Sequence, residues 1–191
     1  MPKRSSLIKI HLMTMTTTKQ LIDEVGVARR NCLAELAHFD DSQAQWKPSA
    51  DSWNAVEITE HLFWAEQGGI LGMWKVLPGI RSGTISYEGP SPNDGLPIDE
   101  VIRLTWKEKE IVPAVAAPRM GGPLAFWTAA LSGLQPILEA FGDILDDDDL
   151  LKKAHPHPIS GSMTFGQRLA FLRFHIDRHR LQAARLKSSR Q

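Results

Sequence analysis

One long helix is predicted for the sequence Thr164-Phe-Gly-Gln-Arg-Leu-Ala-Phe-Leu-Arg-Phe-His175-Ile-Asp-Arg-His179-Arg-Leu-Gln182. Thr164 and Gln167 have the spacing of a capping box, so the helix is expected to begin there. Apolar residues recur in steps of four and three and place one apolar stripe toward a partner. The stripe consists of Phe165, Leu169, Leu172, Ile176, Ala183 and Leu186.

Two histidines on this helix are the sharpest chemical signal in the chain. His179 falls on the apolar stripe, and His175 lies one turn earlier beside it. Residues four apart lie roughly 6 Å apart along a helix axis, so both imidazoles can converge on one metal ion. Ile176 follows His175, so the His-Glu-x-x-His pattern of zinc proteases is absent. A metal site therefore needs a third ligand from elsewhere, and the pair alone leaves a metal-free core role open.

A second predicted helix supplies the candidate third ligand. Asn54 and Glu57 have the spacing of a capping box, and His61 follows on the inner face of the helix. Glu57 lies one turn before His61, so it is a candidate to accept a hydrogen bond from a ligand imidazole. The capping role alone is the favoured interpretation of Glu57.

Length, charge and cysteine content narrow the class of protein. The 191 residues fit one domain, expected over residues 16–188, and residues 1–15 are expected to be disordered. The 22 basic and 22 acidic side chains cancel, so we expect neither a nucleic-acid partner nor an anionic membrane surface. Cys32, the single cysteine, is predicted to be a buried structural thiol in a reducing cytoplasm. No apolar run suits a signal peptide or a membrane span.

The remaining chain predicts an all-α fold with long connections. Besides the helices that begin at Asn54 and Thr164, core helices are expected over about 17–39 and 124–145, the latter with Pro136 inside. A short extra helix is expected over about 98–111, and the Pro- and Gly-rich residues 78–97 are predicted to be a long loop. Four aspartates at 146–149 are interpreted as a solvated charge run, and His155 and His157 as loop residues.

Several motifs together resemble the DinB / YfiT-like superfamily over about residues 18–187. They are Trp46-x-Pro48, Asp51-Ser-Trp53-Asn-x-x-Glu57-x-x-x-His61-Leu62, Gly161-x-x-Thr164 and Phe174-His175-x-x-Arg178-His179-x-x-Gln182. The resemblance implies a four-helix bundle of the DinB/YfiT type with a divalent-metal site formed by His61, His175 and His179. Asn54 stands where Ser is frequent in the family, and the 78–97 loop is longer than is common.

The resemblance also implies a function, because several members are transferases or isomerases that use bacillithiol, mycothiol or glutathione. Zinc or nickel on three histidines keeps a coordination position open and can hold such a thiol as thiolate. We therefore expect a metal-dependent thiol S-transferase that acts on small electrophiles. The alternatives are a metal-dependent hydrolase of small amides and a non-catalytic metal- or ligand-binding stress-response scaffold. Six Trp and seven Phe also suggest a homodimer.

Further residues are candidates to contact a ligand histidine or the substrate. Arg178 lies about 100° round the helix from His179 and is a candidate to bind a cofactor carboxylate, although a surface salt bridge is the commoner fate of such an arginine. Gln182 ends the motif, and Tyr87, the only tyrosine, lies on the long loop. The entrance to the site is expected where the loop between Trp46 and Trp53 meets the 78–97 loop.

Overall fold

The structure, a computed structural model, describes residues 17–108 and 110–189 and shows an all-α protein in that range. The expected disorder of residues 1–15 lies outside the described residues. The helices are α1 (Thr18–Leu36), α2 (Asp41–Gln45), α3 (Ala55–Ser82), α4 (Ile98–Thr105), α5 (Leu124–Gly142), the 3-10 helix η1 (Asp147–Leu151) and α6 (Phe165–Ser188). The predicted all-α class is confirmed. No helix within the described ranges combines the length and apolarity that a membrane span requires.

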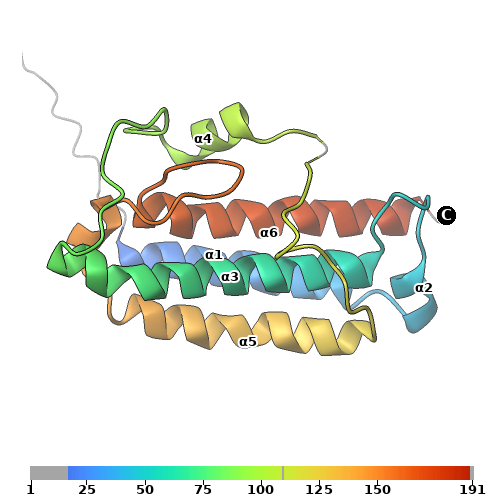
Figure 1. Cartoon of the computed structure of the whole chain (residues 1–191). Coiled ribbons are helices and arrows are strands. Elements are labelled where there is room, and N and C mark those ends of the chain that lie inside the picture. Colours follow the sequence, from blue (N-terminus) through green and yellow to red (C-terminus); the bar gives the residue numbers. More distant parts are fainter. Residues whose placement is uncertain (1–16, 109, 190–191) are drawn as a thin grey trace, which may run out of the picture.

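The four long helices α1, α3, α5 and α6 lie side by side, with α4 and long connections over one side of them (Figure 1). Helix α1 packs against α5 and α6, and α3 packs against the same two helices. The core between them is formed by fully buried apolar side chains, among them Val25, Cys32, Ile70, Met73, Trp127, Leu138 and Ile176. Burial raises the pKa of Cys32 to about 12, which agrees with the predicted structural thiol.

Helix α6 begins as its sequence predicts. The Thr164 hydroxyl accepts from the Gln167 backbone N–H at 3.1 Å, and the Gln167 side chain accepts from the Thr164 N–H at 2.9 Å. The Gln167 amide also donates to the carbonyls of Asn93 and Leu96, which fixes the connection before α4 against this end of α6. The capping box therefore sets both the helix start and the path of a distant loop.

Helix α3 is longer than predicted. The expected loop at 78–97 begins only after Ser82, and Pro78 lies inside the helix. A proline removes one helical hydrogen bond, but Leu77 beside it is 1% exposed, so core burial holds the chain in helical form. Gly83 adopts a left-handed φ of 74° and ends the helix. The consequence is that α3 carries the following loop to the end of the molecule opposite α2 (Figure 1).

Other helix boundaries also differ from the sequence expectation. The predicted 40–52 loop contains the short helix α2, which starts with a capping box between Asp40 and Gln43. Helix α4 ends at Thr105 rather than near 111, and α5 ends at Gly142 rather than 145. The bounds of α1, Thr18–Leu36, are close to the predicted 17–39.

The aspartate run at 146–149 is not wholly solvated, which corrects the sequence interpretation. Asp149 is 1% exposed and accepts hydrogen bonds from Arg81 Nε at 3.1 Å, Lys152 Nζ at 2.8 Å and the Asp146 N–H at 3.1 Å. Burial raises the pKa of Asp149, but these donors outweigh it and lower the pKa to about 2. The ion pair with Arg81 joins the end of α3 to η1.

Asp149→Asn is expected to lower the free energy of unfolding by about 2 kcal/mol at pH 7, since it leaves Arg81 without its buried carboxylate. A lowered carboxyl pKa stabilises the protein above the unfolded value of 3.8, and that stabilisation is lost as the pH falls through about 2. The wild type and the variant should therefore converge in urea titrations as the pH approaches 2. The exposed neighbour Asp148→Asn is the control, and an equal loss in both variants would contradict the account.

Candidate metal centre

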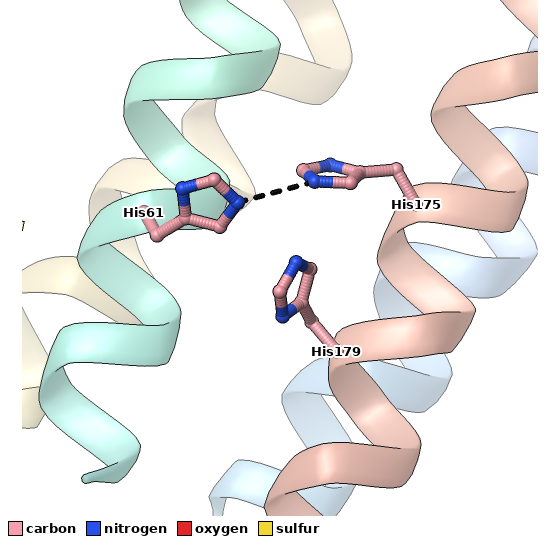
Figure 2. A group of neighbouring side chains, drawn as sticks. All are labelled: His61, His175 and His179. Atoms are coloured by element: carbon pink, nitrogen blue, oxygen red, sulfur yellow. Dashed lines mark hydrogen bonds between the residues drawn. The ribbon is translucent and has the colours of Figure 1, made fainter. Parts of the chain in front are cut away.

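Three histidines from two helices face one another across the interior (Figure 2). His61 projects from α3, and His175 and His179 project from successive turns of α6. One ring nitrogen from each lies within 4.8 Å of the others, and the Nε2 atoms of His61 and His175 are 3.2 Å apart. The structure thus brings together the three residues that the sequence proposed, in an arrangement that could hold a metal ion.

The outer nitrogens of two imidazoles are held by oxygen acceptors. His61 Nδ1 lies 2.8 Å from the Ala116 carbonyl oxygen, and His179 Nδ1 lies 2.8 Å from Gln182 Oε1. A carbonyl oxygen only accepts, so each Nδ1 carries the proton and each Nε2 offers a lone pair. A hydrogen bond of this kind behind a ligand histidine fixes its tautomer and raises its basicity. The donor set therefore fits a divalent metal, and Gln182 contacts a candidate ligand as expected.

The environment keeps the three imidazoles neutral at pH 7. Burial lowers the pKa of His61, and burial together with neighbouring His61 lowers the pKa of His179 to about 3. Burial and then the charges of His179 and His61 hold the pKa of His175 well below its ordinary value. Neutral imidazole is the form that binds a metal ion, so no net loss of charge is required of the three histidines at neutral pH.

Glu57 forms the predicted cap of α3, and no hydrogen bond joins it to a candidate ligand histidine among the described residues. Its carboxylate accepts from the Asn54 N–H at 3.0 Å and from Lys47 Nζ at 2.6 Å. The carbonyl of Ala116, not the Glu57 carboxylate, holds His61. Sequence reasoning could not have found that contact, because a backbone carbonyl is independent of residue type.

Aromatic rings enclose the centre. The Trp53 ring lies 4.9 Å from the His61 ring and 6.2 Å from the His179 ring, measured between centroids. The Trp106 ring lies 6.4 Å from His175 on another side. Trp53 therefore forms a wall of the candidate metal centre. Apolar rings around polar ligands lower the local dielectric and strengthen metal–ligand attraction.

The centre opens into a cavity of about 1530 Å³. Its walls come from α3, α6, residues 47–53, residues between 106 and 118, and residues 155–159. The expected contribution of the 78–97 loop is wrong, because the extension of α3 through Ser82 places that loop elsewhere. Tyr87 is not among the lining residues, so the proposed substrate contact by Tyr87 has no support in the cavity. The connection that follows α4 takes the place of the expected loop.

A buried carboxylate fixes that connection. Glu60 on α3 is 0% exposed and accepts from the backbone N–H groups of Arg119 and Met120 at 2.8 Å and of Gly121 at 2.9 Å. Burial raises the pKa of Glu60, but these donors and the Trp64 indole outweigh it, so the pKa lies below its ordinary value. Glu60 therefore anchors the segment whose Ala116 carbonyl holds His61. Sequence analysis missed this residue.

Arg178 and the two loop histidines also line the cavity. Arg178 donates to the carbonyls of Lys107 at 2.7 Å and Glu108 at 3.2 Å, and its guanidinium lies over the Trp106 ring. It therefore holds the segment after α4. His155 and His157 were interpreted as loop residues; they lie on a loop, but they face the cavity, where burial lowers the pKa of His157 to about 3.

The fold, the paired α6 histidines and the third histidine on α3 define a helical protein with a candidate three-histidine metal centre. The family model of the DinB superfamily matches residues 25–183, and the chain belongs to that superfamily. The resemblance drawn from the motifs is thereby confirmed. No curated protein matches the chain.

One solved structure with the same fold is that of the colibactin self-resistance protein ClbS in complex with a dsDNA. It is 13% identical, the match covers 91% of this chain and 96% of that chain, and the TM-score is 0.52. At this identity the likeness shows the fold alone.

The expectation that nucleic acid is excluded as a partner is corrected by this finding. It was drawn from the zero net charge, yet ClbS carries the same fold and is in complex with dsDNA. Net charge describes the whole surface and says nothing of how charges are distributed over one face. The expected homodimer and cytoplasmic location stay predictions.

Proposed function

We propose that His61, His175 and His179 bind one zinc or nickel ion and that the chain is a metal-dependent enzyme that transfers a low-molecular-weight thiol onto small electrophiles. The observation that carries the proposal is the convergence of three ring nitrogens within 4.8 Å at the wall of a large cavity. Structural metal sites use four protein ligands and are closed, whereas three ligands leave a position for substrate.

The residues around the three histidines support an open, reactive site. Ala116 and Gln182 keep the imidazoles of His61 and His179 oriented with Nε2 inward. The rings of Trp53 and Trp106 limit water on two sides. A bound divalent ion would lower the pKa of a thiol or water at the open position toward neutrality. The cavity is larger than the 300–1,000 Å³ or so of an ordinary ligand pocket, so two reactants fit together.

The activity is tested with protein loaded with zinc or nickel. Free thiol is followed in mixtures of the protein, a low-molecular-weight thiol such as glutathione, and a panel of small alkylating electrophiles. We expect thiol loss above the uncatalysed rate, and we expect His61→Ala to abolish the excess. If the metal-loaded protein consumes no thiol with any electrophile, thiol transfer is ruled out.

Two other functions use the same centre. Hydrolysis of small amides would appear as release of amine by the metal-loaded protein in the absence of thiol. A non-catalytic metal- or ligand-binding scaffold would bind the ion and convert neither the electrophiles nor the amides. The thiol and amide panels run side by side therefore separate all three functions.

A second candidate function is DNA contact, and the fold shared with ClbS is the observation that favours it. Anisotropy of a labelled duplex at low and moderate salt tests it, because phosphate contacts make binding strongly salt-dependent. An unchanged anisotropy at about 100 µM protein, near the weak end of non-specific affinities, would remove this candidate.

A further inference from the structure

A buried arginine shares the cavity with the three histidines. Arg168 lies on α6, is 6% exposed, and is part of the cavity wall. It precedes His175 by seven residues, so the two lie on the same side of the helix, about 10 Å apart along its axis. The cavity thus has a candidate metal centre in one part and a fixed positive charge two helical turns away.

Arg168 has no carboxylate partner among the described residues. Its Nη2 lies 3.4 Å from His155 Nε2, which is a weak contact, and its Nη1 is buried without a hydrogen-bond partner. Burial lowers the pKa of Arg168 to about 10, and the side chain is therefore still charged at pH 7. Burying a charge without a counter-charge lowers the free energy of unfolding. Stability therefore does not explain why an arginine stands at this position.

Arg29 shows what a structural buried arginine looks like in this chain. It is 2% exposed, and its guanidinium donates to Glu66 Oε2 at 2.5 Å and to Gln135 Oε1. Arg168 is about as buried but has only a histidine nitrogen beside it. The contrast indicates that the partner of Arg168 is not among the described residues of the chain.

Glycines on α3 line the cavity opposite Arg168 and His155. A Cβ atom on Gly72 would lie 2.4 Å from the His155 ring, and one on Gly69 would lie 3.6 Å from Arg168 Nη2. A Cβ on Gly68 would meet no atom within 4 Å. Gly72, which weakens the helix by roughly 1 kcal/mol, therefore admits the His155 ring, whereas a Cβ atom would fit at Gly68 and Gly69.

We propose that the cavity binds an amphiphilic small anion. Its carboxylate, or another singly charged acid group, pairs with the Arg168 guanidinium, and its apolar part lies along Met73 and Leu172, which line the same cavity. Its other end, which carries a metal-binding group such as a thiol, reaches the three histidines. The inference rests on the proposed function only for that second end, and it names the class of thiol or substrate that the site would accept.

The test measures the two ends separately by calorimetry. Octanoate and its uncharged amide, octanamide, are titrated into the wild type without added metal, and we expect octanoate to bind at least about tenfold more tightly, because a charge-assisted hydrogen bond replaces a neutral one. Arg168→Met should lose this preference, and Arg168→Lys should retain part of it. The control Arg173→Met removes another α6 arginine, which pairs with Glu24 on α1, and should retain the preference.

One further variant and one further ligand separate this inference from the proposed function. His175→Ala should bind octanoate as the wild type does, so loss of the metal centre leaves the result intact. In zinc-loaded wild type, 8-mercaptooctanoate should bind more tightly than octanoate. Thermal unfolding adds a readout, since a merely structural arginine would lower the midpoint on replacement by Met, whereas Arg168→Met should leave it unchanged or raised. Equal affinities of octanoate and octanamide for the wild type would overturn the proposal, and this result needs no variant.

Discussion

Glu60→Gln is expected to lower the free energy of unfolding by about 2 kcal/mol and to weaken metal binding about tenfold. The stability loss follows because one uncharged amide cannot accept from three backbone N–H groups as the carboxylate does. The metal loss follows because the anchored segment supplies the Ala116 carbonyl that holds His61, and such outer contacts change metal affinity by about 10–100-fold. Urea denaturation and a competitive zinc titration measure the two effects.

The pH dependence of stability and a control variant at a neighbouring glutamate test this prediction further. A lowered pKa of Glu60 means that its stabilisation is present above the unfolded value of 4.5 and is lost as the pH falls through the lower folded value. Glu57→Gln, one turn earlier on α3, keeps its capping geometry and should change stability by less than about 0.5 kcal/mol. If the Glu60→Gln variant binds zinc as tightly as the wild type, the segment that carries Ala116 does not influence metal binding, which would contradict this prediction.

Glu66→Ala is expected to lower the free energy of unfolding by about 3–5 kcal/mol. Glu66 is 0% exposed and forms an ion pair with the buried Arg29, so the variant leaves a buried positive charge without its carboxylate. The double variant Arg29→Met/Glu66→Leu should recover most of that loss, because well-packed apolar residues replace a buried pair at little cost. Equilibrium denaturation of the single and double variants measures both.

An exposed ion pair on α1 provides the control for this result. Lys19 and Asp23 are separated by one helical turn and are 83% and 60% exposed, so Asp23→Ala should change stability by less than about 1 kcal/mol. Similar losses for Asp23→Ala and Glu66→Ala would show that burial does not govern the strength of these pairs. A double variant as unstable as Glu66→Ala would show that packing, not the orphaned charge, causes the loss.

The three histidines were predictable from sequence because helices determine their placement. A four-residue spacing puts His175 and His179 on one face of α6, and the capping box at Asn54 sets the phase of α3 and so the direction of His61. Capping and periodicity depend only on residues close in sequence, and the structure contains both predicted capping boxes. Pro78 lies inside α3 against the prediction from sequence, because burial of Leu77 outweighs a helix-breaking residue.

The surroundings of the histidines could not be predicted in the same way. The contact from Ala116 uses a backbone carbonyl, and the segment that carries it has no periodicity to reveal its path. Glu60 and Arg168 did leave a signal, since apolar residues stand three or four positions away on the same helix faces. They are Val56, Phe63 and Trp64 around Glu60, and Phe165, Phe171 and Leu172 around Arg168. A charged residue at such a position deserves a search for its partner, which for Glu60 is backbone and for Arg168 is absent from the described chain.

Metal content by mass spectrometry, on protein purified without a histidine tag, tests the three-histidine centre most directly. We expect about one zinc or nickel ion per chain in the wild type, because three neutral imidazoles bind one ion. The metal should be lost in His175→Ala and retained in His155→Ala, which removes another histidine of the same cavity. A wild type that is metal-free and also refuses added zinc and nickel, or a His175→Ala variant that holds as much metal as the wild type, would contradict this expectation.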